Sequence, residues 1–246
     1  MYPIISMIIT YDSTRAVTVT KKDDHTYYVK MYSLEDYDLT FEEEIGGEPE
    51  NYIKLKEVEQ NAAGSEFAII YFDDGIWFLR TFGKETRTPE EIAENEVEIN
   101  ALLDLDDYTM VNNEFPYPFA TCNFVTDTRI FISVFYNYDR SHYHLIWDTK
   151  KRRMIGEPQK YTLDCNMKNF PNKSFYSEEK DEIYLFYRQG NAFIIDPNNV
   201  SNYKYEKIID KDLGDMVLLW GQAMICRSSS SVYFFKRVFD KMAKQT

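Results

Sequence analysis

The feature that most constrains the fold is a hairpin pattern that recurs along the whole chain. Each copy consists of an apolar strand, a short polar turn, a second apolar strand and another polar turn, and repeats of this kind indicate a modular architecture. In the first copy, Val17 and Val19 alternate with Thr18 and Thr20, which is the period of two expected of a half-buried strand. The pattern therefore predicts an all-β protein.

Five copies of the hairpin can be traced. In the second copy the turn is Asp73-Asp74-Gly75, and an Asp-Gly turn between apolar runs is a strong hairpin signal. The five hairpins are predicted at residues 15–33, 66–81, 129–148, 182–196 and 222–236. First strands are predicted at residues 4–10, 52–58, 119–125, 173–176 and 216–220, and fourth strands at 37–45, 152–157 and 203–209.

The spacing of the copies fits four-stranded propeller blades. The positions that align with one another are Tyr32, Leu79, Trp147, Ile195 and Phe235, and they are 47, 68, 48 and 40 residues apart. Three of these intervals are close to one blade, and this length favours a propeller over a sandwich. The long interval contains Thr88 followed by Pro89 and two acids, which predicts a helical insertion at about residues 88–105. We therefore expect one domain over residues 1–246.

Two segments carry a family resemblance. Residues 144–157 (HLIWDTKKRRMIGE) resemble the third strand, Trp-Asp turn and fourth strand of a WD repeat, and residues 29–43 have the same layout with Tyr32-Ser33 in the Trp-Asp place. Trp147-Asp148 matches the signature dipeptide, and the chain contains no Gly-His pair. The chain thus resembles a degenerate WD-repeat β-propeller of about five blades, in which Trp147 and Asp148 would be structural signature residues.

The ends of the chain leave the closure of such a propeller open. WD-type propellers usually close with an N-terminal strand that completes the last blade, but residues 1–10 already form the first strand of copy one. Residues 237–246 predict a short amphipathic helix, with Val238, Phe239 and Met242 as candidate partner-docking residues. Either the ring closes by side-chain packing or by pairing of the first strand with that of Phe235, or another protein subunit covers an open edge.

Composition disfavours several classes of partner. The 41 acidic and 28 basic residues give a net charge of −13, which repels nucleic acid and anionic membranes. The cluster Lys150-Lys151-Arg152-Arg153 is interpreted as a solvated turn, with a site for an acidic motif as the alternative. No stretch approaches the roughly 20 apolar residues of a membrane span. The three cysteines fit neither a disulfide framework nor a zinc site, which favours an intracellular, cytoplasmic location.

The sequence offers little material for catalysis. His142, His144 and Asp148 could in principle hold a metal, but ordinary packing is the favoured interpretation, and no metal, cofactor or catalytic residue is predicted. The acidic runs at residues 42–44, 73–74 and 104–107 are interpreted as solvated loops. The predicted function is a non-catalytic scaffold or complex subunit that mediates protein–protein interaction. The alternative is a propeller hydrolase that acts on a sugar or phosphate ester through channel carboxylates.

Overall fold

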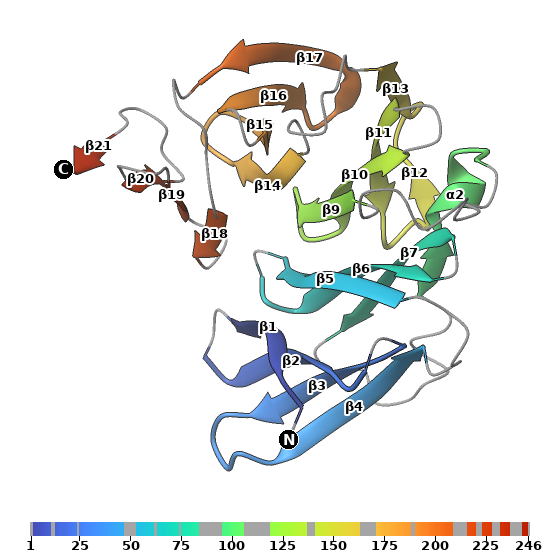
Figure 1. Cartoon of the computed structure of the whole chain (residues 1–246), viewed down its shortest axis with the longest axis vertical. Coiled ribbons are helices and arrows are strands. Elements are labelled where there is room, and N and C mark those ends of the chain that lie inside the picture. Colours follow the sequence, from blue (N-terminus) through green and yellow to red (C-terminus); the bar gives the residue numbers. More distant parts are fainter. Residues whose placement is uncertain are drawn as a thin grey trace. The chain divides into compact units, whose positions relative to one another are not determined.

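The structure is a computed structural model that is nearly all β (Figure 1). It describes residues 2–10, 13–23, 25–46, 53–61, 63–73, 75–83, 95–105, 119–136, 141–162, 171–187, 190–208, 216–219, 223–227, 232–236 and 243–245. These residues form five antiparallel sheets, each built from strands consecutive in sequence. The chain divides into two compact units, residues 1–122 and 123–246, and each is described by itself. That the whole chain is one domain stays a prediction.

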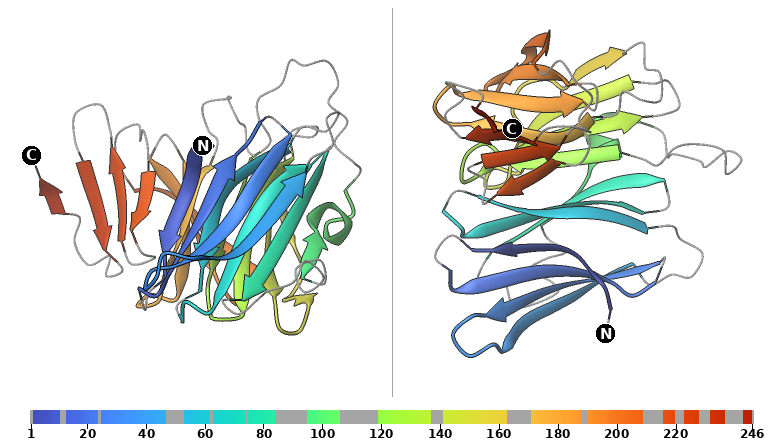
Figure 2. Two further views of the ribbon diagram at one scale, coloured as in Figure 1. Left: turned by 90° about the horizontal axis from the view of Figure 1, so that it is seen from below. Right: turned by 60° about the vertical axis from the view of Figure 1, so that its left-hand side comes forward.

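The first sheet follows the chain in the order β1-β2-β3-β4. Its strands are β1 (Ile4–Ile9), β2 (Arg15–Lys21), β3 (Thr26–Ser33) and β4 (Leu39–Gly46). Figure 2 shows the four blue strands of this sheet side by side. Directly opposite residues share a face, so Val17, which is opposite Ile8 and Met31, lies on one face and Thr18 on the other. The predicted strands and their alternation are confirmed in this sheet.

The second sheet has the order β5-β6-β7-β8. Its strands are β5 (Ile53–Gln60), β6 (Glu66–Asp73), β7 (Ile76–Gly83) and β8 (Glu96–Glu98). Asp73 is opposite Ile76 across a two-residue connection, and Gly75 has φ +96°, a left-handed conformation that favours glycine. The Asp-Gly hairpin predicted from the sequence is therefore confirmed.

The helical insertion predicted at about residues 88–105 is wrong for part of its length. Residues 84–94 lie outside the described residues, Glu96–Glu98 is strand β8, and helix α2 covers only Ile99–Leu102. β8 is strand because it pairs with β7, whose outer hydrogen-bonding groups would otherwise be unpaired at the sheet edge. Pairing with a neighbouring strand therefore outweighs the local helix signal here.

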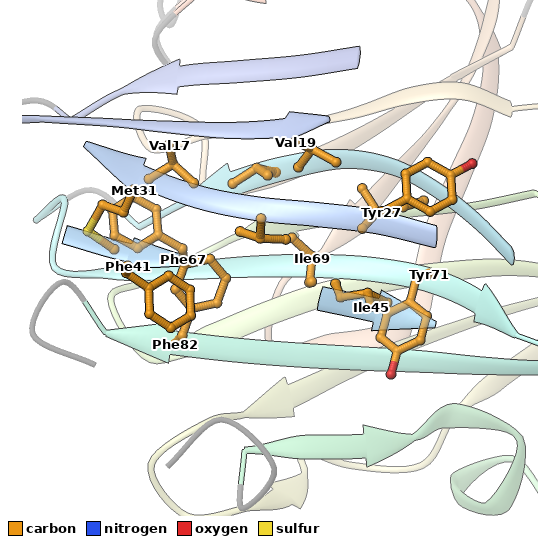
Figure 3. Packing of buried hydrophobic residues seen from close by; sticks show 13 residues of the cluster. Val17, Val19, Tyr27, Met31, Phe41, Ile45, Phe67, Ile69, Tyr71 and Phe82 are labelled. Atoms are coloured by element: carbon orange, nitrogen blue, oxygen red, sulfur yellow. The ribbon is translucent and has the colours of Figure 1, made fainter. Parts of the chain in front are cut away.

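The core of the first unit lies between its two sheets. One cluster of buried residues includes Val17 and Val19 on β2 and Phe67 and Ile69 on β6, and Figure 3 shows these side chains between the ribbons. Phe82 on β7 stacks on Phe67 with ring centroids 5.4 Å apart. Each buried aromatic or branched side chain contributes on the order of 1.5–3 kcal/mol by leaving water. This packing buries one face of the first sheet, and the other face lies outside this core.

The third and fourth sheets belong to the second unit, whose boundary falls within β9. The third contains β9 (Phe119–Phe124), β10 (Arg129–Tyr136), β11 (Ser141–Asp148), β12 (Arg153–Met154) and β13 (Gln159–Thr162). The fourth has the order β14 (Pro171–Ser177), β15 (Glu182–Tyr187), β16 (Asn191–Asp196) and β17 (Asn199–Lys207). Their common core includes Phe131, Ile146, Leu185, Phe193 and Ile195.

The fifth sheet consists of β18 (Met216–Leu219), β19 (Ala223–Arg227), β20 (Val232–Lys236) and β21 (Ala243–Gln245). The prediction of a helix over residues 237–246 is wrong at its end, because β21 pairs with β20 along its edge. Val238, Phe239 and Met242 lie outside the described residues, so their docking role stays a prediction. Within the described part of the chain, the strand of Phe235 pairs with β19 and β21 and β1 pairs with β2, so the predicted alternative that joins these two strands directly is not observed.

Among the residues that the structure describes, no helix has the length and apolar character of a membrane span.

Candidate functional site

The signature residues Trp147 and Asp148 end strand β11. Trp147 is buried and lies opposite Ile130 on β10 and Met154 on β12. Asp148 is also buried, and its Oδ1 accepts a hydrogen bond of 2.8 Å from the backbone N–H of Lys151. The pair thus anchors a strand and fixes the turn that follows, which is a structural role.

His142 and His144 lie inside the second unit among aromatic rings. His144 contacts Phe131 and Phe193 with centroids 5.3 and 5.7 Å apart, and the Tyr187 hydroxyl lies 3.4 Å from His142 Nδ1. Burial lowers the pKa of His142 to about 3 and that of His144 well below its ordinary value, so both are neutral at pH 7. Both rings serve the core here, and no set of three metal-ligating side chains occurs among the described residues.

A charged network that the sequence did not reveal joins the two sheets of the first unit. Arg80 on β7 donates from Nη1 to Glu43 Oε1 on β4 (3.1 Å) and from Nε to Glu96 Oε2 on β8 (2.7 Å). The Tyr71 hydroxyl also donates to Glu96, and the guanidinium lies over the Tyr71 ring, 5.5 Å from its centroid. Burial raises the pKa of Glu43, and Arg80 opposes this rise. The network ties one sheet to the other through charge.

A polar groove of about 230 Å³ lies on the fourth sheet. Three of its lining residues are acids, namely Asp181, Glu182 and Asp196. Each accepts a hydrogen bond from a side chain of this sheet: Asp181 from Tyr176 (2.8 Å), Glu182 from Tyr184 (2.5 Å) and Asp196 from Asn202 (3.2 Å). These carboxylates therefore organise the sheet's own turns and strands.

The outer face of the first sheet, opposite the core, combines exposed apolar and buried polar groups. We call it the open face, and it comprises Ile4, Met7, Ile9, Ala16, Thr18, Thr20, Tyr28, Lys30, Tyr32, Glu42 and Glu44. On β1, Ile4 is 60% exposed and Met7 is 58% exposed. On β2, Thr18 and Thr20 are only 6% and 8% exposed, and within the described residues their hydroxyls have no hydrogen-bond partner.

The neighbouring strands of the open face carry charge that is balanced locally. Lys30 pairs with Glu42, and its ammonium lies 5.1 Å from the centroid of the Tyr28 ring. Tyr2 stacks on the Tyr28 ring, with the ring centroids 5.9 Å apart. The face therefore grades from apolar on β1, through hydroxyls on β2, to paired charges on β3 and β4.

Sequence signals for these sites differ in strength. The run IISMII of β1 is uncharged, which is unusual for an edge strand and could have indicated an unprotected edge. No pattern could have indicated that Arg80 meets Glu43, because the two are 37 residues apart and belong to different sheets.

No protein-family model and no curated protein matches the chain. The resemblance to WD repeats consequently depends on the residues of the chain itself, above all Trp147 and Asp148. Both residues are buried at the end of β11, and neither lines the groove on the fourth sheet.

Proposed function

We propose that the chain is a non-catalytic scaffold subunit that binds another protein, and that its five sheets are the blades of a degenerate WD-type propeller. The order of consecutive antiparallel strands within each sheet supports this architecture, because propellers repeat such units along the chain. The spacing of the hairpins supports it as well. The surface that would bind the partner is the open face of the first sheet.

The observation that carries this proposal is the contrast between β1 and β2 on the open face. Ile4 and Met7 expose apolar area, which is favourable to cover. Beside them, the hydroxyls of Thr18 and Thr20 are buried without a partner in the described part of the chain. Leaving a buried hydroxyl unsatisfied costs about 1–3 kcal/mol, so a surface that reaches these oxygens gains from pairing them.

The partner is therefore a protein surface with apolar side chains above β1 and hydrogen-bonding groups above β2. β1 adds a second means of attachment, since it pairs with β2 and is the edge strand of its sheet within the described residues. An uncharged edge strand can accept a further strand through its outward backbone groups. One of these groups is already used, because the Gln60 side chain donates to the Ile9 carbonyl (2.9 Å).

Methionine oxidation tests this function directly. Met7 is exposed and Met31 is buried, so peroxide should oxidise Met7 quickly and Met31 slowly in the isolated chain. In the complex recovered from native cells through a tag at the C-terminus, Met7 should become protected while Met31 stays unchanged. Peptide mass spectrometry measures both rates in one sample. Protection of Met7 in the isolated monomer would contradict the proposal, since the chain itself would then cover the face.

A pair of variants separates binding from folding. Met7→Glu places a charge on the open face and should reduce the recovered complex by at least about tenfold, the effect of a loss near 1.4 kcal/mol. Tyr37→Glu changes a side chain that is exposed in the turn before β4 and should leave the complex intact. Equal recovery of the complex with the two variants, both with an unchanged thermal midpoint, would refute the assignment of the face.

A further inference from the structure

A cluster of four cations interrupts this acidic protein at one turn of the second unit. We call residues 150–153 the basic turn; it contains Lys150, Lys151, Arg152 and Arg153, and it joins β11 to β12. All four residues are exposed, and the Lys151 side chain is 57% exposed. In a chain of net charge −13, such a concentration of positive charge is a local exception.

Two hydrogen bonds hold the backbone at the start of the basic turn. The Asp148 carboxylate accepts the N–H of Lys151 (2.8 Å), and Thr149 donates its N–H to the Thr128 carbonyl of the preceding turn (2.8 Å). Arg152 has φ +50°, a left-handed conformation that is costly for a residue with a side chain. A turn that is fixed in this way loses little further backbone entropy when a ligand binds.

The acids around the basic turn balance only part of its charge. Asp148 is buried and lies 3.9 Å from the Lys151 ammonium, so it balances one charge. Asp127 is an exposed acid in the turn whose Thr128 carbonyl accepts the Thr149 N–H, and Glu157 is an exposed acid beyond β12. Lys150 and Arg153 form no ion pair within the described residues. An anionic ligand can therefore reach at least two cations that are not already compensated.

The size of the turn and the charge of the rest of the chain select the ligand. Four residues span at most about 14 Å, which matches about four consecutive residues of an extended segment. A short acidic segment meets the cations of the turn directly, while its interaction with charges farther than about 8 Å away is largely screened by salt. A nucleic acid or an anionic membrane presents charge over a longer distance, where the net charge of −13 repels it.

We propose that the basic turn is a docking site for an acidic protein segment with three or four consecutive Asp or Glu residues. This site is separate from the open face of the first sheet. A variant that alters one surface leaves the other intact, so Met7→Glu should leave binding to the basic turn unchanged.

Fluorescence anisotropy with a fluorescein-labelled oligoglutamate peptide tests the site on the full chain. The triple variant K150Q/K151Q/R153Q should bind about tenfold more weakly than the natural chain, the loss that three surface ion pairs of ordinary strength give. Arg152 stays unchanged because its left-handed backbone would complicate a substitution. Raising the salt concentration should weaken binding to the natural chain more than binding to the triple variant.

A matched control keeps the change in net charge constant. K180Q/K204Q/K207Q removes three exposed lysines of the fourth sheet and should bind the peptide like the natural chain, with a thermal midpoint that shows both triple variants to be folded. Equal weakening in the two triple variants would overturn the proposal, since net charge alone would then explain binding. So would the absence of binding to the natural chain, or tighter binding of an oligouridylate RNA than of oligoglutamate.

Discussion

Replacing Arg80 by Met is the sharpest test of how the first unit is held together. The guanidinium contacts Glu43, Glu96 and Tyr71, and all of these groups are mostly buried. Removing one partner of a fully buried ion pair costs about 3–5 kcal/mol, whereas exposed pairs contribute about 0–1 kcal/mol. Arg80 is closer to the first case but keeps some contact with water, so we expect the free energy of unfolding to fall by about 2–3 kcal/mol at pH 7.

The effect of pH in this variant has a definite sign. Burial already raises the pKa of Glu43, and removing Arg80 removes the charge that opposes the rise. An acid whose pKa is higher in the folded state binds a proton more readily there than in the unfolded state. This acid therefore contributes more to stability as the pH falls. The loss caused by Arg80→Met should therefore be smaller at pH 5 than at pH 7.

Hydrogen–deuterium exchange in a urea series, read on peptides from β6 and β7, measures the stability of this unit separately from the other. Arg129→Met is the matched control, read on peptides from β10 in its own unit, because Arg129 makes an exposed hydrogen bond to Asn198 (3.3 Å) and its loss should cost at most about 0.5 kcal/mol. A loss below about 1 kcal/mol for Arg80→Met, or a loss that grows toward pH 5, would refute this reasoning.

Three further outcomes are expected in the second unit. His142 has a pKa of about 3 in the folded protein against an ordinary value of 6.5, so the unfolded state binds the proton at the higher pH. Stability should therefore fall as the pH is lowered from 6.5 to about 3. Urea midpoints should show a shallower fall for His142→Phe. Asp148→Ala should cost about 1–2 kcal/mol in thermal unfolding because the Lys151 N–H loses its acceptor, while Asp148→Asn should cost less than half as much. Phe193→Ala should cost about 3–5 kcal/mol in urea unfolding, because Phe193 packs on His144, Tyr187 and Tyr205; a cost under about 1 kcal/mol would show that this core refills the cavity.

The strands were predictable because their signal is local. Alternation such as that of Val17 to Thr20, and a turn such as Asp73-Asp74-Gly75, specify a hairpin within a few residues. Each sheet is then assembled from strands that follow one another in sequence, so long-range pairing did not need to be guessed. The predicted positions of the first three strands consequently agree with the structure in all five sheets, whereas β8 and β21 were not predicted as strands.

The two wrong helix predictions have one cause. Glu96–Glu98 and Ala243–Gln245 lie in segments whose composition suits a helix, yet each adds the last strand to a sheet. The preference of a short segment amounts to less than about 1 kcal/mol per residue, and the hydrogen bonds of an available sheet edge exceed it. Local sequence cannot show that such an edge is nearby.

By itself, the sequence determined an all-β chain of repeated hairpins and the cationic character of residues 150–153. The tertiary structure alone decided that Arg80 meets Glu43 and that His142 is a neutral core residue. It also decided that Met7 is exposed beside the buried Thr18. The physical reason is that alternation and turn chemistry act between neighbours in the chain, whereas burial and charge pairing depend on which strands come together.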